Sequence, residues 1–206
     1  MPELYAPGMH ESRWERLFEG LEHQFAAERE REHEALAGES ERDRIARLSL
    51  RDRFASLGAG AQIAVRDAAG ESHRLRLLAV GSDWLAGESE ELRGVTIIRI
   101  CAIDELRLPA AMRRASLAGA RTDPLLARMG TGFVLRALAR RRAAVTIATL
   151  RGGRHPGTIS RAGSDHVDVI VHEAGLSAAA ASDEVVIALD AIAWVRTNDR
   201  GAIDVG

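Results

Sequence analysis

Two stretches of the chain decide its fold. Residues 61–87 read AQIAVRDAAGESHRLRLLAVGSDWLAG, and residues 143–169 read AAVTIATLRGGRHPGTISRAGSDHVDV. At a constant offset of 82 residues, and without a gap, the two stretches share their turn residues. The matched positions are Gly70 and Gly152, His73 and His155, and the tripeptides Gly81-Ser82-Asp83 and Gly163-Ser164-Asp165. Self-similarity at a fixed spacing predicts an internal duplication.

A second pair of matching stretches follows the first. Residues 95–107, VTIIRICAIDELR, align with residues 184–196, EVVIALDAIAWVR, at an offset of 89. The difference between the two offsets falls in the loop around residues 178–181. Within each copy, alternating apolar residues separated by glycine-containing turns indicate five short strands. Five strands in so short a segment predict a small, strongly bent barrel that closes its own edges.

Each predicted barrel follows an amphipathic stretch. Ile45, Leu48, Phe54 and Leu57 precede the first barrel, and residues 133–138 precede the second. Thr131 stands between two glycines just before the second stretch, where we predict that it caps a helix. A phosphate-binding role for Gly130-Thr131-Gly132 is the alternative, although a third glycine of a dinucleotide motif is missing.

Two segments carry a resemblance to a known family. Residues 157–160, GTIS, lead to residues 164–169, SDHVDV, in the manner of the first Sm motif, and residues 98–103, IRICAI, are similar to the second. The chain therefore resembles the Sm-like fold of Sm, LSm and Hfq proteins. That resemblance implies RNA binding, and pairing of exposed edge strands between barrels. Val167 and Asp168 stand where the family has its base-binding asparagine, and Leu75 replaces a strand glycine. Two barrels in one chain would allow a pseudo-dimer in place of a ring.

These observations predict an α+β protein with an N-terminal helical region and two tandem Sm-like or SH3-like five-stranded barrels, each preceded by a helix. The expected divisions are a charged amphipathic helix over 1–44, a first barrel with its leading helix over 45–108, a basic linker over 109–130, and a second barrel with its leading helix over 131–206.

Charge is distributed very unevenly along the chain. All 28 basic residues are arginine, and residues 107–161 carry a net charge of +11 while residues 1–44 and 162–206 carry −6 each. Guanidinium groups fit phosphate oxygens, so the central segment predicts nucleic-acid binding through phosphates. Internal ion pairing with the acidic ends is the alternative. The candidate contacts are Arg113, Arg114, Arg136, Arg140, Arg141, Arg142, Arg151 and Arg154.

The N-terminal helix carries an aromatic stripe. Trp14, Phe18, Leu21 and Phe25 recur at a spacing of three to four residues, which places them on one helix face. The stripe either packs against the chain's own barrels or docks on a protein partner or a second copy. The second possibility defines our alternative function, a protein-interaction adaptor.

The sequence favours no catalytic, metal or cofactor site. The seven histidines lack metal-ligand spacing, and the matched position of Cys101 in the second copy is Asp190. Cys101 is therefore expected to be a buried thiol or a turn residue. We predict a non-enzymatic protein that binds RNA in preference to DNA. No secretory signal or membrane span is visible, which predicts a cytoplasmic protein.

Overall fold

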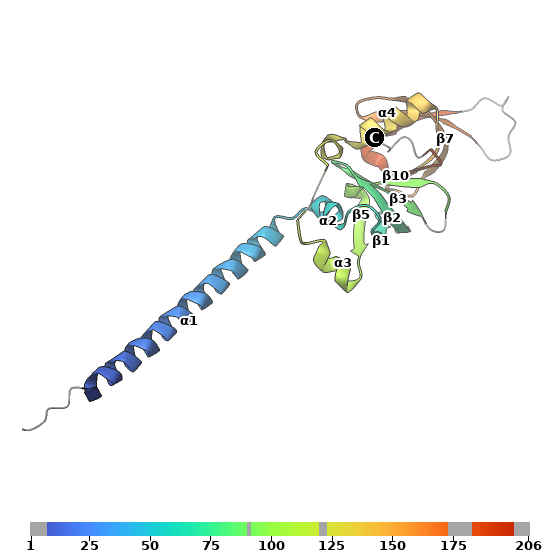
Figure 1. The fold of residues 1–206 in the computed structure, drawn as a ribbon. Coiled ribbons are helices and arrows are strands. Elements are labelled where there is room, and N and C mark those ends of the chain that lie inside the picture. Colours follow the sequence, from blue (N-terminus) through green and yellow to red (C-terminus); the bar gives the residue numbers. More distant parts are fainter. Residues whose placement is uncertain (1–7, 90–91, 120–122, 173–182, 200–206) are drawn as a thin grey trace, which may run out of the picture. The chain divides into compact units, whose positions relative to one another are not determined.

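The computed structural model describes residues 8–89, 92–119, 123–172 and 183–199, except for the side chains of residues 8–20, 26 and 27. It divides into two compact units, Met1–Leu48 and Ser49–Gly206. The chain is an α+β protein with a few helices and one large antiparallel sheet, as Figure 1 shows.

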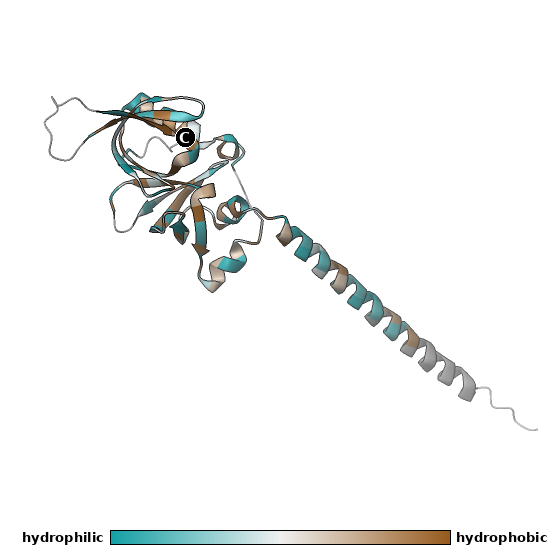
Figure 2. Cartoon of the chain, turned by 180° about the vertical axis from the view of Figure 1, so that it is seen from behind, coloured by the Kyte–Doolittle hydropathy of each residue, from teal (hydrophilic) through white to brown (hydrophobic). Residues whose placement is uncertain are grey.

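The first unit consists of one long helix, α1 (Gly8–Ala46). The helix ends two residues beyond the predicted segment 1–44, because residues 39–46 continue the same helix-favouring composition after Gly38. Figure 2 shows that its described part is mostly hydrophilic, with hydrophobic residues at isolated positions. Most of its described side chains are exposed, so the described part of the helix has no buried apolar face within its own unit.

The predicted helix over residues 45–57 is divided in the structure. Ile45 belongs to α1, whereas Phe54 is buried in α2 (Leu50–Leu57). The break arises at Ser49, which begins α2 with a reciprocal capping box. Its hydroxyl accepts a hydrogen bond from the Asp52 amide at 3.1 Å, and the Asp52 carboxylate accepts one from the Ser49 amide at 3.2 Å.

Ten strands form two sets of five. The first set is β1 (Gln62–Asp67), β2 (Ser72–Val80), β3 (Trp84–Ser89), β4 (Val95–Arg99) and β5 (Ile103–Arg107). The second set is β6 (Ala144–Thr149), β7 (Arg154–Ala162), β8 (His166–Val171), β9 (Glu184–Ala188) and β10 (Ile192–Thr197). Short 3₁₀ helices, η1 (Ile100–Ala102) and η3 (Leu189–Ala191), separate the last two strands of each set.

The strands join into one open sheet. Their order is β5-β1-β2-β3-β4-β10-β6-β7-β8-β9, with antiparallel pairing throughout. The predicted pair of separate barrels with closed edges is therefore not what the structure contains. The outer edge of β4 pairs with β10 of the second set, for example Ile97 with Val195, and this pairing merges the two sets.

The two sets have matching local geometry. In the β1–β2 turn, the Glu71 amide donates to the Asp67 side chain at 2.8 Å, and in the β6–β7 turn the Gly153 amide donates to the Thr149 side chain at 3.0 Å. Register shifts interrupt the pairing of β2 after Leu77 and of β7 after Ile159, which are equivalent positions. Such irregularities bend and twist a strand.

The central strands are buried on both faces. Trp84 in β3 packs in one hydrophobic core together with β6–β10 and α4 (Thr131–Arg141), while its neighbour Leu85 packs in another with β1, β2 and α2. Trp194 of β10 belongs to this second core. Strands covered on both faces read as continuous apolar runs, which explains residues 95–98, VTII, and 192–195, IAWV.

The segment predicted as a basic linker contains helical elements. They are α3 (Ala110–Ala115) and η2 (Leu126–Arg128). A hydrogen bond of 3.0 Å from Arg53 to the Ser116 hydroxyl ties the end of α3 to α2. This hydrogen bond fixes the first part of the linker to α2. The end of the linker leads into α4.

Candidate functional site: a pocket at the start of α4

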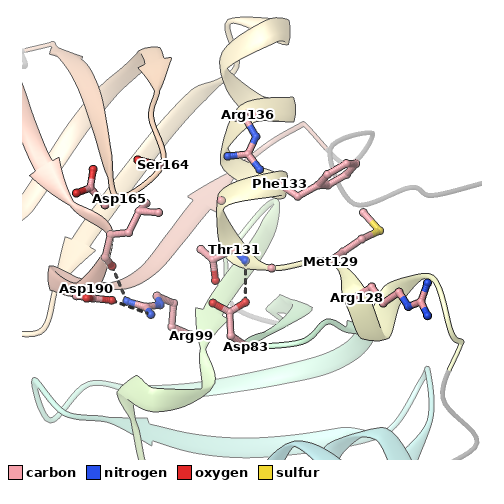
Figure 3. Close-up of a pocket in the computed structure, with 13 residues that line it drawn as sticks. Asp83, Arg99, Arg128, Met129, Thr131, Phe133, Arg136, Ser164, Asp165 and Asp190 are labelled. Atoms are coloured by element: carbon pink, nitrogen blue, oxygen red, sulfur yellow. Dashed lines mark hydrogen bonds and ion pairs between the residues drawn. The ribbon is translucent and has the colours of Figure 1, made fainter.

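A pocket of about 520 Å³ lies where the two sets of strands meet the beginning of α4 (Figure 3). The β2–β3 turn, the end of β4 and η2 contribute to its wall, together with the β7–β8 turn and η3. The charged and polar residues of the lining are Asp83, Arg99, Arg128, Thr131, Arg136, Ser164, Asp165 and Asp190.

The start of α4 is held in place by the β2–β3 turn. The Asp83 carboxylate accepts a hydrogen bond of 2.7 Å from the Thr131 amide, so a residue far away in the sequence caps the helix. The Trp84 indole donates to the Met129 carbonyl at 2.7 Å. Gly81 allows this approach, because a Cβ there would lie 2.2 Å from the Trp84 ring nitrogen.

The predicted capping role of Thr131 is wrong. Gly130 is the N-cap residue and Thr131 is the first residue of the helix. Asp83 has taken the role that we assigned to the Thr131 side chain. Thr131 is only 3% exposed, and its hydroxyl oxygen is buried. This oxygen makes no hydrogen bond within the described structure. A buried hydroxyl without a partner is costly, and a polar group that came within hydrogen-bond distance of it would relieve that cost.

Three arginines line the pocket together with Thr131. Arg99, whose side chain is 12% exposed, donates to the Leu189 carbonyl and pairs with Asp190 at 3.3 Å, and these bonds connect β4 with η3. Its Nε is buried without a partner in the described structure. Arg128 and Arg136 are exposed, and among the described residues neither forms an ion pair. Figure 3 places Arg136 above Thr131 on α4, with Arg128 on the adjoining η2.

The acidic residues of the pocket are already engaged. Asp83 caps α4 and Asp190 pairs with Arg99. Asp165 shares a hydrogen bond of 2.7 Å with His166, which lowers the pKa of Asp165 and raises the pKa of His166. Arg128 and Arg136 are thus lining cations without an ion-pair partner among the described residues, while Asp83 keeps its negative charge because a backbone amide does not neutralise a carboxylate.

The eight predicted arginines are exposed but do not form a single patch. Arg113 and Arg114 lie on α3, and Figure 1 shows α3 and α4 well apart within the second unit. Arg136, Arg140 and Arg141 lie on α4, followed by Arg142 in the left-handed conformation at its C-cap. Arg151 and Arg154 belong to the β6–β7 turn region.

Ion pairing involves a minority of these arginines. Arg141 lies 3.5 Å from Asp199, and Arg154 lies 2.7 Å from Glu71. Among the described residues, the acidic segment 162–206 thus forms one ion pair with the eight predicted arginines, between Asp199 and Arg141. Sequence reasoning missed Arg99, whose role depends on contact with η3 some 90 residues later. The repeated Gly-Ser-Asp turns were the sequence feature that could have indicated the pocket, because residues of both turns line it.

The predicted partner-binding stripe is described in part. Leu21 is 40% exposed and Phe25 is 59% exposed. The side chains of Trp14 and Phe18 lie outside the described residues. None of the described helices has the length and hydropathy needed to cross a membrane.

Other candidate chemistry lies away from the pocket. Cys101 is a turn residue in η1 and is exposed, so the predicted burial of its thiol is wrong. Among the described residues, one group of side chains is arranged so that it could hold a metal ion, namely Asp67, Glu71 and His73. Comparisons of the chain with protein-family models, curated proteins and solved structures find no match.

Proposed function

We propose that this is a non-enzymatic nucleic-acid-binding protein of the cytoplasm that contacts phosphate groups, with RNA preferred to DNA. The observation that carries the proposal is the pocket at the start of α4. There Arg128 and Arg136, which are both exposed, line the pocket together with Thr131, whose buried hydroxyl has no partner among the described residues.

The pocket has the chemistry of a phosphate site. Guanidinium groups bind phosphate oxygens through paired N–H donors, whereas the beginning of α4 already holds the Asp83 carboxylate. Arg140 lies one turn after Arg136 and is exposed, so the positive surface continues along α4. A phosphodiester chain that enters the pocket would therefore meet further cations along the helix.

An aromatic side chain at the pocket favours a single-stranded ligand. Phe133 lines the pocket and is 42% exposed. Unstacked bases of single-stranded RNA can stack on such a ring, whereas the bases of a duplex are already stacked. Phe133 therefore supports a single-stranded ligand, and the preference for RNA over DNA comes from the Sm-like resemblance.

The arrangement of the strands supports an Sm-like interpretation of the fold. We infer that residues 61–107 and 143–197 are two copies of one module, because the order β5-β1-β2-β3-β4 recurs as β10-β6-β7-β8-β9. The β4–β10 pairing joins the edge of one copy to the edge of the other. This pairing is of the kind expected in the pseudo-dimer that two barrels in one chain would allow.

The test is fluorescence anisotropy of labelled single-stranded RNA and duplex DNA, titrated with the protein over a series of salt concentrations. We expect R128Q/R136Q to weaken RNA binding and to reduce the slope of log K against log salt by about 1.4, because each single-strand phosphate contact contributes roughly 0.7. R161Q is the matched control, because Arg161 is exposed on β7 and lies 3.8 Å from Asp168, outside the pocket. Absence of binding at low salt, or equal loss in both variants, would overturn the proposal.

A protein-interaction role for α1 is the second candidate. Leu21, Phe25 and Leu36 are exposed on this helix, and Leu36 is 63% exposed. If the helix mediates self-association, F25E should lower the weight-average mass in sedimentation equilibrium, while H23E on the same exposed helix should not. If the parent protein is monomeric, self-association through α1 is excluded.

A further inference from the structure

A second cluster of polar side chains lies at the β1–β2 turn, outside the pocket at α4. Asp67 ends β1, Glu71 follows in the turn, and His73 is near the start of β2. Potential metal-ligand atoms of the three residues lie within 4.8 Å of one another. Asp67 is fully buried and His73 is 4% exposed, so two of the three residues lie in the interior.

The turn orients the Asp67 carboxylate. Its Oδ1 accepts hydrogen bonds from the amides of Ala69, at 3.0 Å, and Glu71, at 2.8 Å. Its Oδ2 forms a hydrogen bond of 3.0 Å with Nε2 of His73, and a bound ion would replace this hydrogen bond. Backbone donors of this kind fix ligating carboxylates in metal sites. The oxygen–nitrogen separation is close to the roughly 3.3 Å between neighbouring ligands around a tetrahedral ion with bonds of about 2.0 Å.

The cluster is covered by the second set of strands. The rings of His73 and Trp194 meet edge to face with their centroids 5.7 Å apart. Glu71 pairs with Arg154 of β7 at 2.7 Å, and the Arg154 guanidinium lies over the Trp194 ring. Because the Glu71–Arg154 pair is partly exposed, Glu71 can exchange this partner at small cost.

We propose that Asp67, Glu71 and His73 form a binding site for a divalent transition-metal ion of the zinc type. Imidazole nitrogen and carboxylate oxygen are donors that such ions accept, and three protein ligands leave a fourth position for water. The bound ion would fix the β1–β2 turn where it meets β7 and β10. This inference is independent of the proposed nucleic-acid function.

The chain provides an internal control at the matching turn. His155 aligns with His73, but Thr149 and Gly153 stand in place of Asp67 and Glu71. Gly153 donates its amide to the Thr149 hydroxyl, as Glu71 does to Asp67, so the turn geometry is retained without either carboxylate. A histidine at this position without the acidic residues should not hold a metal.

The experiment is titration of the metal-free full-length protein with Co²⁺, followed by visible absorption, with Zn²⁺ added to displace the Co²⁺. We expect one Co²⁺ per chain with a visible band, and Zn²⁺ should also raise the melting temperature. E71Q should weaken Co²⁺ binding at least about tenfold, since it removes a ligand and leaves the buried Asp67–His73 pair intact. H73Q should abolish the band, and H155Q should retain it.

Two results would overturn the proposal. One is the absence of a visible band or of a Zn²⁺-dependent melting shift in the parent protein. The other is a band of unchanged affinity in E71Q, which would assign the bound metal to other histidines. Because E71Q changes a partly exposed side chain, circular dichroism should show that it folds like the parent, and the comparison does not depend on whether H73Q folds.

Discussion

At the scale of single residues, Thr131 connects stability with the proposed function. Its hydroxyl is buried without a described partner, and an unsatisfied buried polar group costs about 1–3 kcal/mol. Thr131→Val keeps the shape of the side chain and removes the hydroxyl. We therefore expect the free energy of unfolding to rise by about 1 kcal/mol in urea denaturation, while RNA binding measured by anisotropy weakens.

Thr131→Ser is the matched control, because it keeps the hydroxyl and should retain most of the RNA binding. A Val variant that is destabilised by more than about 1 kcal/mol would mean that the hydroxyl has a stabilising partner in the free protein. A Val variant that is more stable and binds RNA as before would remove Thr131 from the site.

At the scale of elements, the start of α2 depends on one capping box. Ser49 and Asp52 satisfy each other's backbone amides. Ser49→Ala removes the hydroxyl acceptor and should cost about 1 kcal/mol in chemical denaturation. Ser72→Ala is the control, because Ser72 is exposed at the start of β2, and it should change stability by less than about 0.5 kcal/mol. Equal effects in the two variants would contradict the capping role.

The same capping box predicts a pH dependence. The Ser49 hydroxyl is the main cause of the lowered pKa of Asp52, followed by its backbone amide and Arg51 as favourable partners. A carboxyl whose pKa is lower in the folded state stabilises the protein above its unfolded pKa of about 3.9, and this contribution is lost as the pH falls through the folded pKa. The stability difference between the parent and Asp52→Asn should therefore be constant near neutral pH and shrink in acid. A difference that does not depend on pH would contradict this role of the carboxylate.

The elements also show what the sequence can and cannot predict. The strands and turns follow from local patterns, and the strand glycine Gly157 is required because a Cβ there would lie 2.2 Å from the Ile170 carbonyl oxygen. The capping of α4 by Asp83 joins residues 48 positions apart, and no local pattern contains that information. The predicted Thr131 cap was wrong for this reason. The proposed metal ligands were not predicted because Asp67 and His73 meet only when the hairpin folds.

The joining of the two sets of strands into one sheet was not predicted for the same reason. Each copy alone has the pattern of a small barrel, so local reasoning predicts closed edges. Whether the edges close depends on whether β4 pairs with a strand from outside its own copy. That pairing is a property of the whole chain. In the structure β10 is that partner, and the continuous apolar runs in β4 and β10 fit strands that are buried on both faces.

At the scale of the whole second unit, the shared strands predict a single unfolding transition. Phe54 is fully buried in the core of the first set, which also contains Trp194 of the second set, while Trp84 of the first set packs in the other core. Each core therefore loses some of its packing residues if the other set of strands unfolds. Phe54→Ala should therefore cost about 3–5 kcal/mol and lower the temperature of one calorimetric peak by about 10 °C, without splitting it.

Leu92→Ala is the control for this variant, because Leu92 is 47% exposed and its truncation should shift the peak little. The ratio of calorimetric to van 't Hoff enthalpy, taken for the main transition, should stay near one in the parent and in both variants. If Phe54→Ala instead produced two peaks, with only the first moving to lower temperature, the two sets of strands would be independent folding units. The β4–β10 pairing would then be a contact between two domains, and not the centre of one sheet.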